Sequence, residues 1–171
     1  MKERSNLVTM KGNPVVLMGD EVQVGDKLPD SELVKNDLSP VKLSSYQDKI
    51  LIICTVPSLD TGVCDAETRR FNEEAASLSD DIKVLTISMD LPFAQARWCG
   101  AAGIENVETL SDHKNCNFGQ QVGVCIKDLR LMARAVFVVD KDGTIKYTEL
   151  VPEITNEPDY DAAINAAKQL V

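Results

Sequence analysis

Three residues at fixed spacing, Pro57, Thr61 and Cys64, stand out for their capacity to do chemistry. The apolar run of residues 50–56 predicts a buried strand, and Pro57 ends it because proline supplies no N–H to a sheet ladder. Apolar residues recur at helical spacing after Cys64, so this cysteine is expected in the first turn of a helix. The N–H groups and dipole at a helix start favour an anion, and a thiolate is a nucleophile. The segment therefore predicts a reactive cysteine where a strand meets a helix.

Acidic side chains around Cys64 oppose this ionisation. Asp60, Asp65 and Glu67 place negative charge near the sulfur, and negative charge disfavours a thiolate. A reactive Cys64 therefore requires a cation from elsewhere in the chain. Arg134, within the otherwise apolar strand expected over residues 133–139, is the candidate, because a buried arginine needs an anion. The alternative is an arginine that faces solvent or pairs structurally with an acidic residue.

The other four cysteines divide less clearly. Cys54 lies in the middle of the first buried strand and is expected to be a core residue. A zinc cluster is possible by residue type from Cys116, Cys125, Cys99 and His113. However, the chain has no Cys-x-x-Cys, and the spacing of these residues matches zinc sites poorly. Core or surface thiols are the default interpretation. An odd number of cysteines without framework spacing favours a reducing compartment.

Composition bounds the classes of function. A chain of 171 residues with 44% hydrophobic residues suits one domain, residues 1–171, with a sizeable core. The net charge of −9 argues against nucleic acid and anionic membrane as partners, since both attract basic surfaces. The N-terminus opens no signal peptide, and no run is long enough to span a bilayer. We therefore expect a cytoplasmic protein.

The elements that must position these residues follow from hydrophobic periodicity. Strands are expected over 6–10, 14–18, 32–35, 50–56, 82–89, 108–111, 133–139 and 144–150, and helices over 65–78, 93–102, 114–122 and from Tyr160. The order β-α-β-α followed by a β-hairpin and a helix predicts an α/β, thioredoxin-like fold. It has a central mixed sheet flanked by helices and an additional N-terminal β-hairpin.

The spacing of Pro57, Thr61 and Cys64 resembles the Pro-x-x-x-Thr-x-x-Cys signature of the peroxiredoxins. Two longer segments resemble the thiol peroxidase branch, the atypical two-cysteine kind. They are Val-Pro-Ser-Leu-Asp-Thr-Gly-Val-Cys-Asp-Ala-Glu-Thr-Arg-Arg-Phe-Asn and Ser-Met-Asp-Leu-Pro-Phe-Ala-Gln-Ala-Arg-Trp-Cys-Gly. The similarity runs nearly end to end. One departure is residues 125–132, which lack the glycines expected before the arginine strand.

The resemblance implies a role for each site residue. Cys64 would attack the peroxide, Thr61 and Arg134 would hydrogen-bond the thiolate and the peroxide oxygens, and Pro57 would shield the sulfur from water. Cys99 would be the resolving cysteine, which closes an intramolecular Cys64–Cys99 disulfide. Because a disulfide needs Cα atoms within about 7 Å and the two cysteines sit on different expected helices, both segments are expected to unravel locally.

The resemblance also implies partners and excludes cofactors. Hydrogen peroxide or organic hydroperoxides would be reduced to water or alcohols, thioredoxin would restore the dithiol, and the protein would be a homodimer. No metal, haem or flavin would be required. Two rival interpretations are a thioredoxin-like disulfide exchanger, which normally needs Cys-x-x-Cys, and a redox-dead binding or metal-sensing module built on Cys99, Cys116 and Cys125.

Overall fold

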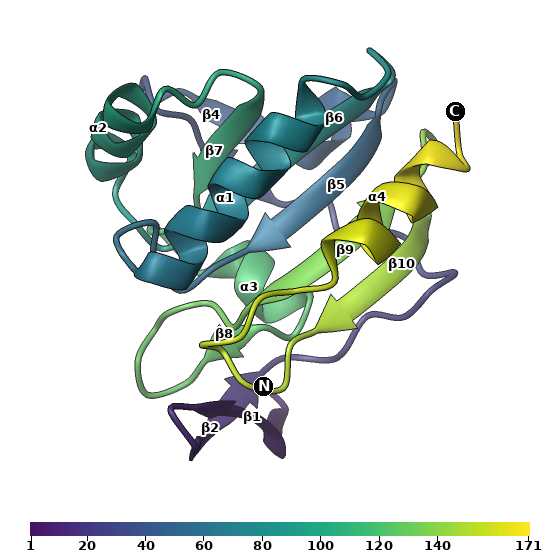
Figure 1. Cartoon of the computed structure of the whole chain (residues 1–171). Helices are drawn as coiled ribbons and strands as arrows, with labels where there is room; N and C mark the ends of the chain where they lie inside the picture. The colour runs from purple at the N-terminus through teal and green to yellow at the C-terminus, as the bar shows by residue number, and fades with distance from the viewer.

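The structure, a computed structural model, describes residues 1–171, and its centre is a seven-stranded mixed sheet (Figure 1). In chain order the elements are β1 (Glu3–Met10), β2 (Asn13–Met18), β3 (Glu32–Val34), β4 (Pro40–Lys42), the 3₁₀ helix η1 (Leu43–Tyr46), β5 (Ile50–Thr55), α1 (Gly62–Ala75), β6 (Ile82–Ser88), α2 (Pro92–Ala102), β7 (Val107–Ser111), α3 (Asn117–Gln121), β8 (Cys125–Ile126), β9 (Ala135–Val139), β10 (Ile145–Leu150) and α4 (Tyr160–Lys168). The strand order is β10-β9-β5-β6-β7-β3-β4. Strands β5, β6 and β7 are parallel, while β9 runs antiparallel to both β5 and β10. This is the predicted thioredoxin-like arrangement.

Strand β5 is apolar along its whole length because both faces of the sheet are covered. Successive side chains of a strand point to opposite faces. Ile50, Ile52 and Cys54 join the core formed with α1 and α4, which lie on one face of the sheet (Figure 1). Leu51 and Ile53 join the larger core on the other face, where the N-terminal hairpin and α3 pack. Both faces of β5 are thus covered by side chains. The chain turns into α1 at the carboxyl end of this strand.

The N-terminal hairpin is confirmed, and it belongs to a second, three-stranded sheet of order β1-β2-β8. Val8 and Leu17 point from it into the core and are fully buried. The backbone N–H of Thr9 donates to the carbonyl of Pro152 at 2.8 Å, which ties β1 to the loop before α4. The hairpin is thereby held beside the end of the main sheet that carries the α1 start.

The structure corrects several of the expected boundaries. The helix expected over 65–78 is α1, Gly62–Ala75, which begins and ends three residues earlier. The helix expected over 114–122 is the shorter α3, because Cys116 has φ 49°, a left-handed conformation that no α-helix can pass through. Arg134 lies one residue before β9, not inside a strand. None of the helices combines the length and the apolar character that crossing a lipid bilayer requires.

Candidate active site

Cys64 is the third residue of α1, in the first turn as the sequence predicted, and it is fully buried. Thr61 is the N-cap residue, but its side chain caps no helix N–H. Its Oγ1 instead lies 2.7 Å from Cys64 Sγ and 3.0 Å from the carbonyl oxygen of Ser58. Since a hydroxyl has one proton and two lone pairs, it can accept from a thiol while donating to Ser58, or donate to a thiolate. Thr61 can therefore stabilise either protonation state of the sulfur.

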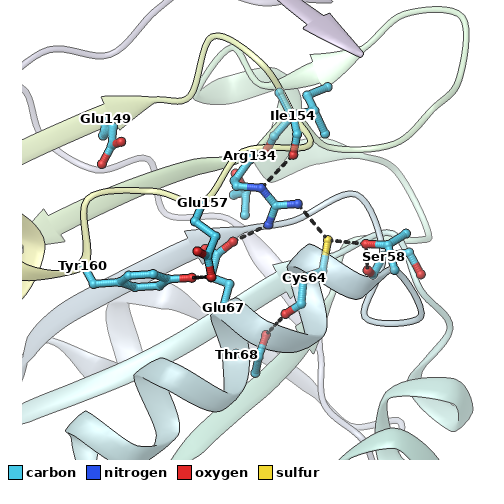
Figure 2. Close-up of polar contacts among 12 residues, drawn as sticks. Ser58, Cys64, Glu67, Thr68, Arg134, Glu149, Ile154, Glu157 and Tyr160 are labelled. Atoms are coloured by element: carbon cyan, nitrogen blue, oxygen red, sulfur yellow. Dashed lines mark hydrogen bonds and ion pairs between the residues drawn. The ribbon is translucent and has the colours of Figure 1, made fainter. Parts of the chain in front are cut away.

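Arg134 brings the cation that the acidic surroundings of Cys64 require. Its Nη2 donates to Cys64 Sγ at 3.1 Å, its Nε donates to the carbonyl oxygen of Ile154 at 2.9 Å, and its Nη1 donates to a carboxylate oxygen of Glu67. Figure 2 shows the planar guanidinium between the sulfur and the Glu67 carboxylate. The side chain is 1% exposed, so three acceptors in different directions hold it in one orientation without competition from water.

Glu67 has a place in the site that sequence reasoning does not reveal. Its sequence position indicates only a negative charge that opposes a thiolate, whereas it lies buried with one oxygen on Arg134 and the other without any hydrogen-bond partner. The pKa of Glu67 is raised to about 7, mainly by burial and further by the nearby Glu149 and Glu157, while Arg134 opposes the rise. Near neutral pH Glu67 therefore exchanges between a neutral and a charged partner for Arg134. Its position three residues after Cys64 was visible in the sequence, but nothing local distinguished it from a surface acid.

This raised pKa predicts a pH-dependent stability. The unfolded chain ionises Glu67 near its ordinary value of 4.5 and the folded chain only near 7, so ionisation favours the unfolded state as the pH rises through that window. The unfolding free energy of the wild type, relative to Glu67→Gln, is expected to fall by about 2 kcal/mol between about pH 5.5 and 8.5. Urea unfolding of both proteins across this range measures it. A difference that does not change with pH would contradict the prediction.

Asp90 fixes the loop that precedes Cys64. Its carboxylate accepts from the Ser58 hydroxyl at 2.7 Å, from the backbone N–H of Leu59 at 2.9 Å and from the Ser88 hydroxyl at 2.7 Å. The loop between Pro57 and the α1 start is thus attached to the segment that follows β6. This gives a physical role to the acidic residue of the Asp-Leu-Pro-Phe-Ala-Gln segment.

A cavity of about 510 Å³ opens onto the site. Pro57, Thr61 and Arg134 line it, so the structure brings together the site residues that the sequence predicted around Cys64. Met10 and Lys11 of the N-terminal hairpin form another part of the wall. No local sequence signal indicates this contribution, because the hairpin reaches the site only through its tertiary contact with the loop before α4.

Cys99 lies outside this cluster. It sits in α2, half-buried, with Sγ 3.4 Å from the hydroxyl of Thr109 on β7, and burial raises the pKa of its thiol. All five cysteines are free thiols in the structure. The neighbours of the two expected partners do touch: Trp98 Nε1 donates to the carboxylate of Asp65 at 3.0 Å. The start of α1 and the middle of α2 are therefore side by side, while the Cys64 and Cys99 sulfurs bind different groups.

The remaining cysteines do not form a metal centre. Cys54 is buried in the core on the α1 side of the sheet. Cys116 and Cys125 lie together, but no group of three or more His, Cys, Asp or Glu side chains is arranged to hold a metal ion. The zinc-cluster interpretation, which needed Cys99 beside that pair, lacks the required geometry.

Known proteins share both this sequence and this architecture. A family model described as redoxin matches residues 23–164. A thiol peroxidase of Bacillus subtilis strain 168 is 58% identical over 164 residues, which are 96% of this chain and 98% of that relative. A thiol peroxidase of Halalkalibacterium halodurans is 57% identical over 161 residues, which are 94% of this chain and 96% of that relative. The chain belongs to the thiol peroxidases of the redoxin family.

Solved structures agree with this assignment. The crystal structure of a peroxiredoxin-like protein from Aquifex aeolicus has a TM-score of 0.91 and 44% sequence identity, with 98% of this chain and 99% of that chain covered. The predicted fold class and family are thus confirmed. As a thiol peroxidase, the protein is an enzyme that reduces peroxides and takes the electrons from a thiol reductant.

Proposed function

We propose that this thiol peroxidase reduces hydrogen peroxide and organic hydroperoxides through the thiolate of Cys64. The observation that carries the proposal is the convergence of two donors, Thr61 Oγ1 and Arg134 Nη2, on one buried sulfur. The thiolate attacks one peroxide oxygen and the O–O bond breaks. Cys64 becomes a sulfenic acid, and the other oxygen takes up a proton and leaves as water or alcohol. The two donors align the peroxide and stabilise the charge that develops on the leaving oxygen, while Pro57 shields the sulfur from water.

We propose that Cys99 resolves the sulfenic acid. The contact between Asp65 and Trp98, each next to one of the two cysteines, supports this pairing because it keeps the two segments adjacent. Both sulfurs must leave their present partners, so the first turn of α1 and the Cys99 segment of α2 unwind before the disulfide closes. Packing does not require a glycine at position 62, because a Cβ there would meet nothing within 4 Å. Gly62 would instead ease the unwinding through the backbone freedom of glycine.

The reductant we propose is thioredoxin, acting by dithiol exchange on the Cys64–Cys99 disulfide. Access to Cys99 supports this: the residue lines an open cavity of about 390 Å³ together with Asn36, Lys83 and Glu108. A protein dithiol can approach the sulfur from this side without entering the peroxide cavity. Five thiols in one chain suit work in the reducing cytoplasm.

Cys99→Ser separates resolution from the first step. This variant is expected to consume one equivalent of peroxide at a rate within about threefold of the wild type, because the Cys64 cluster is unchanged. It is expected to lose thioredoxin-driven cycling by at least about 100-fold, since no thiol closes the disulfide. Stopped-flow peroxide consumption and a coupled thioredoxin assay measure the two steps. Full cycling in Cys99→Ser would remove Cys99 from the mechanism.

We further propose that the enzyme is a homodimer. Leu91 and Phe93, at the start of α2, are 54% and 67% exposed and form an apolar surface beside the Asp90 loop. Burying such side chains against a second copy is favourable, and it would place the interface next to the site. Sedimentation velocity at micromolar concentration is expected to give a dimer for the wild type and a monomer for Phe93→Glu. A monomeric wild type would contradict this.

A further inference from the structure

A second pair of cysteines lies away from the peroxide cavity and has no part in the mechanism above. Cys116 Sγ donates to Cys125 Sγ at 2.9 Å, and both residues are fully buried. Cys116 precedes α3 and Cys125 opens β8, so the contact joins the start of a short helix to the strand that pairs with the N-terminal hairpin. We call Cys116 and Cys125 the second cysteine pair.

The surroundings leave room for the two sulfurs and little else. A Cβ on Gly119 would lie 3.2 Å from Cys116 Sγ and 3.5 Å from Cys125 Cβ, so a side chain at this position would push against the pair. The buried carboxylate of Asp112 accepts from the backbone N–H of Asn117 at 3.0 Å and of Gly119 at 2.9 Å, which fixes the α3 turn over the sulfurs. The pair is therefore held close by the backbone around it. A disulfide at about 2.05 Å would need the sulfurs to approach by less than about 1 Å.

We propose that the second cysteine pair is a redox site that peroxide converts to a disulfide, separately from Cys64 and Cys99. The Cys125 thiolate attacks a peroxide oxygen, the O–O bond breaks, and Cys125 becomes a sulfenic acid while one water leaves. The Cys116 sulfur then attacks Cys125, the S–O bond breaks, and the second water leaves. Two thiols and one hydrogen peroxide thus give one disulfide and two waters.

The hydrogen bond within the pair assigns the nucleophile. Cys116 donates and Cys125 accepts, which lowers the pKa of Cys125 and raises that of Cys116. Arg130 adds to the lowering at Cys125, whereas burial and Asp112 oppose it. Cys64 is also buried, but its neighbours line the peroxide cavity, whereas the second cysteine pair lies away from that cavity. Peroxide therefore reaches the pair only when the α3 segment opens, so this oxidation is much slower than attack by Cys64.

The position of the pair connects it mechanically to the peroxide site. The backbone N–H of Ile126 donates to the carbonyl of Leu131, and that of Ala133 donates to Val124, each at 2.8 Å, so Cys125 lies in a ladder that leads directly into Arg134. A disulfide would brace this ladder against the α3 turn. The oxidised pair would therefore stabilise the segment that presents Arg134 to the sulfur of Cys64.

Digestion with trypsin gives a direct readout, because residues 115–127 form one tryptic peptide that contains both cysteines of the pair. The Cys64→Ser/Cys99→Ser variant, which retains only Cys54 and the second cysteine pair, is exposed to excess hydrogen peroxide. Catalase then removes the peroxide, and the protein is unfolded with N-ethylmaleimide before digestion. The peptide is expected to carry no maleimide and to be lighter than the unalkylated reduced peptide by two hydrogens, about 2 Da. Dithiothreitol is expected to reverse the change. Two maleimides on the peptide after hours of exposure, or sulfinic acid without a disulfide, would overturn the proposal.

Thermal melting tests the bracing effect in the same background. The oxidised variant is expected to melt about 5 to 10 °C above its reduced form, because the new bond restricts the unfolded chain. The matched control adds Cys116→Ala, which keeps the Cys125 sulfur but is expected to show neither the lighter peptide nor the shift in Tm. Equal melting temperatures for the oxidised and reduced forms would overturn the bracing role. Because the variant has no Cys64, failure here leaves the proposed peroxidase mechanism untouched.

Discussion

Cys64→Ser is expected to lower peroxidase turnover by at least about 10⁴-fold, because it removes the proposed nucleophile, on which every later step of the proposed mechanism depends. A serine hydroxyl at the same place remains protonated at neutral pH, so Thr61 and Arg134 have no anion to orient. The coupled thioredoxin assay with hydrogen peroxide measures the loss. Circular dichroism is expected to be unchanged, since the substitution replaces one atom in a buried position.

The matched control is Cys54→Ala. Cys54 is equally buried and lies in the strand that leads to the site, but it faces the core formed with α1 and α4. Turnover in this variant is expected to stay within about threefold of the wild type, even if the small cavity lowers its stability. Turnover retained in Cys64→Ser, or lost equally in both variants, would contradict the assignment of the nucleophile.

Arg134→Lys is expected to lower kcat/KM for hydrogen peroxide by about 10² to 10³-fold. The guanidinium donates in three fixed directions, to Cys64, Glu67 and Ile154. A lysine ammonium keeps the charge but is a single point on a flexible stem, so it cannot satisfy the three acceptors in that geometry. Stopped-flow measurement of the first oxidation isolates this effect from later exchange with thioredoxin.

A second variant separates catalysis from folding. Removing the guanidinium leaves Glu67 buried without a partner, which alone can destabilise the protein. Arg134→Met/Glu67→Gln removes both charges, so it is expected to fold while remaining about 10² to 10³-fold slower. Wild-type rates in the folded double variant would show that Arg134 serves only to neutralise Glu67.

Thr61→Val deletes the other donor to the sulfur. It is expected to lower kcat/KM for hydrogen peroxide by about 10-fold or more in the same stopped-flow measurement.

Much of the fold was predictable because its signals are local. The apolar run of β5, the turn between β9 and β10, and Pro92 at the first position of α2 each specify an element from adjacent residues. The errors came where tertiary contacts decide the backbone. Cys116 adopts a left-handed conformation that its sequence does not favour, and this shortens α3.

The site was predictable in part for the same reason. Thr61 and Cys64 lie within one loop and one helical turn, so their contact follows from spacing. The need for a cation followed from the acidic neighbours of Cys64, and Arg134 was identified because an arginine among apolar residues requires an anion. Glu67 was misjudged because burial is a property of the assembled fold and not of its position on α1.

One measurement tests the central claim most directly: disulfide mapping after a single equivalent of hydrogen peroxide. Reduced wild-type protein is mixed with peroxide, blocked within seconds with N-ethylmaleimide under unfolding conditions, and digested with trypsin without reduction. The account predicts a cross-link between the tryptic peptides 50–69 and 98–114, with fragmentation placing it on Cys64 and Cys99 and with Cys54 alkylated. Recovery of Cys64 fully alkylated, with the oxidation found on another cysteine, would contradict it.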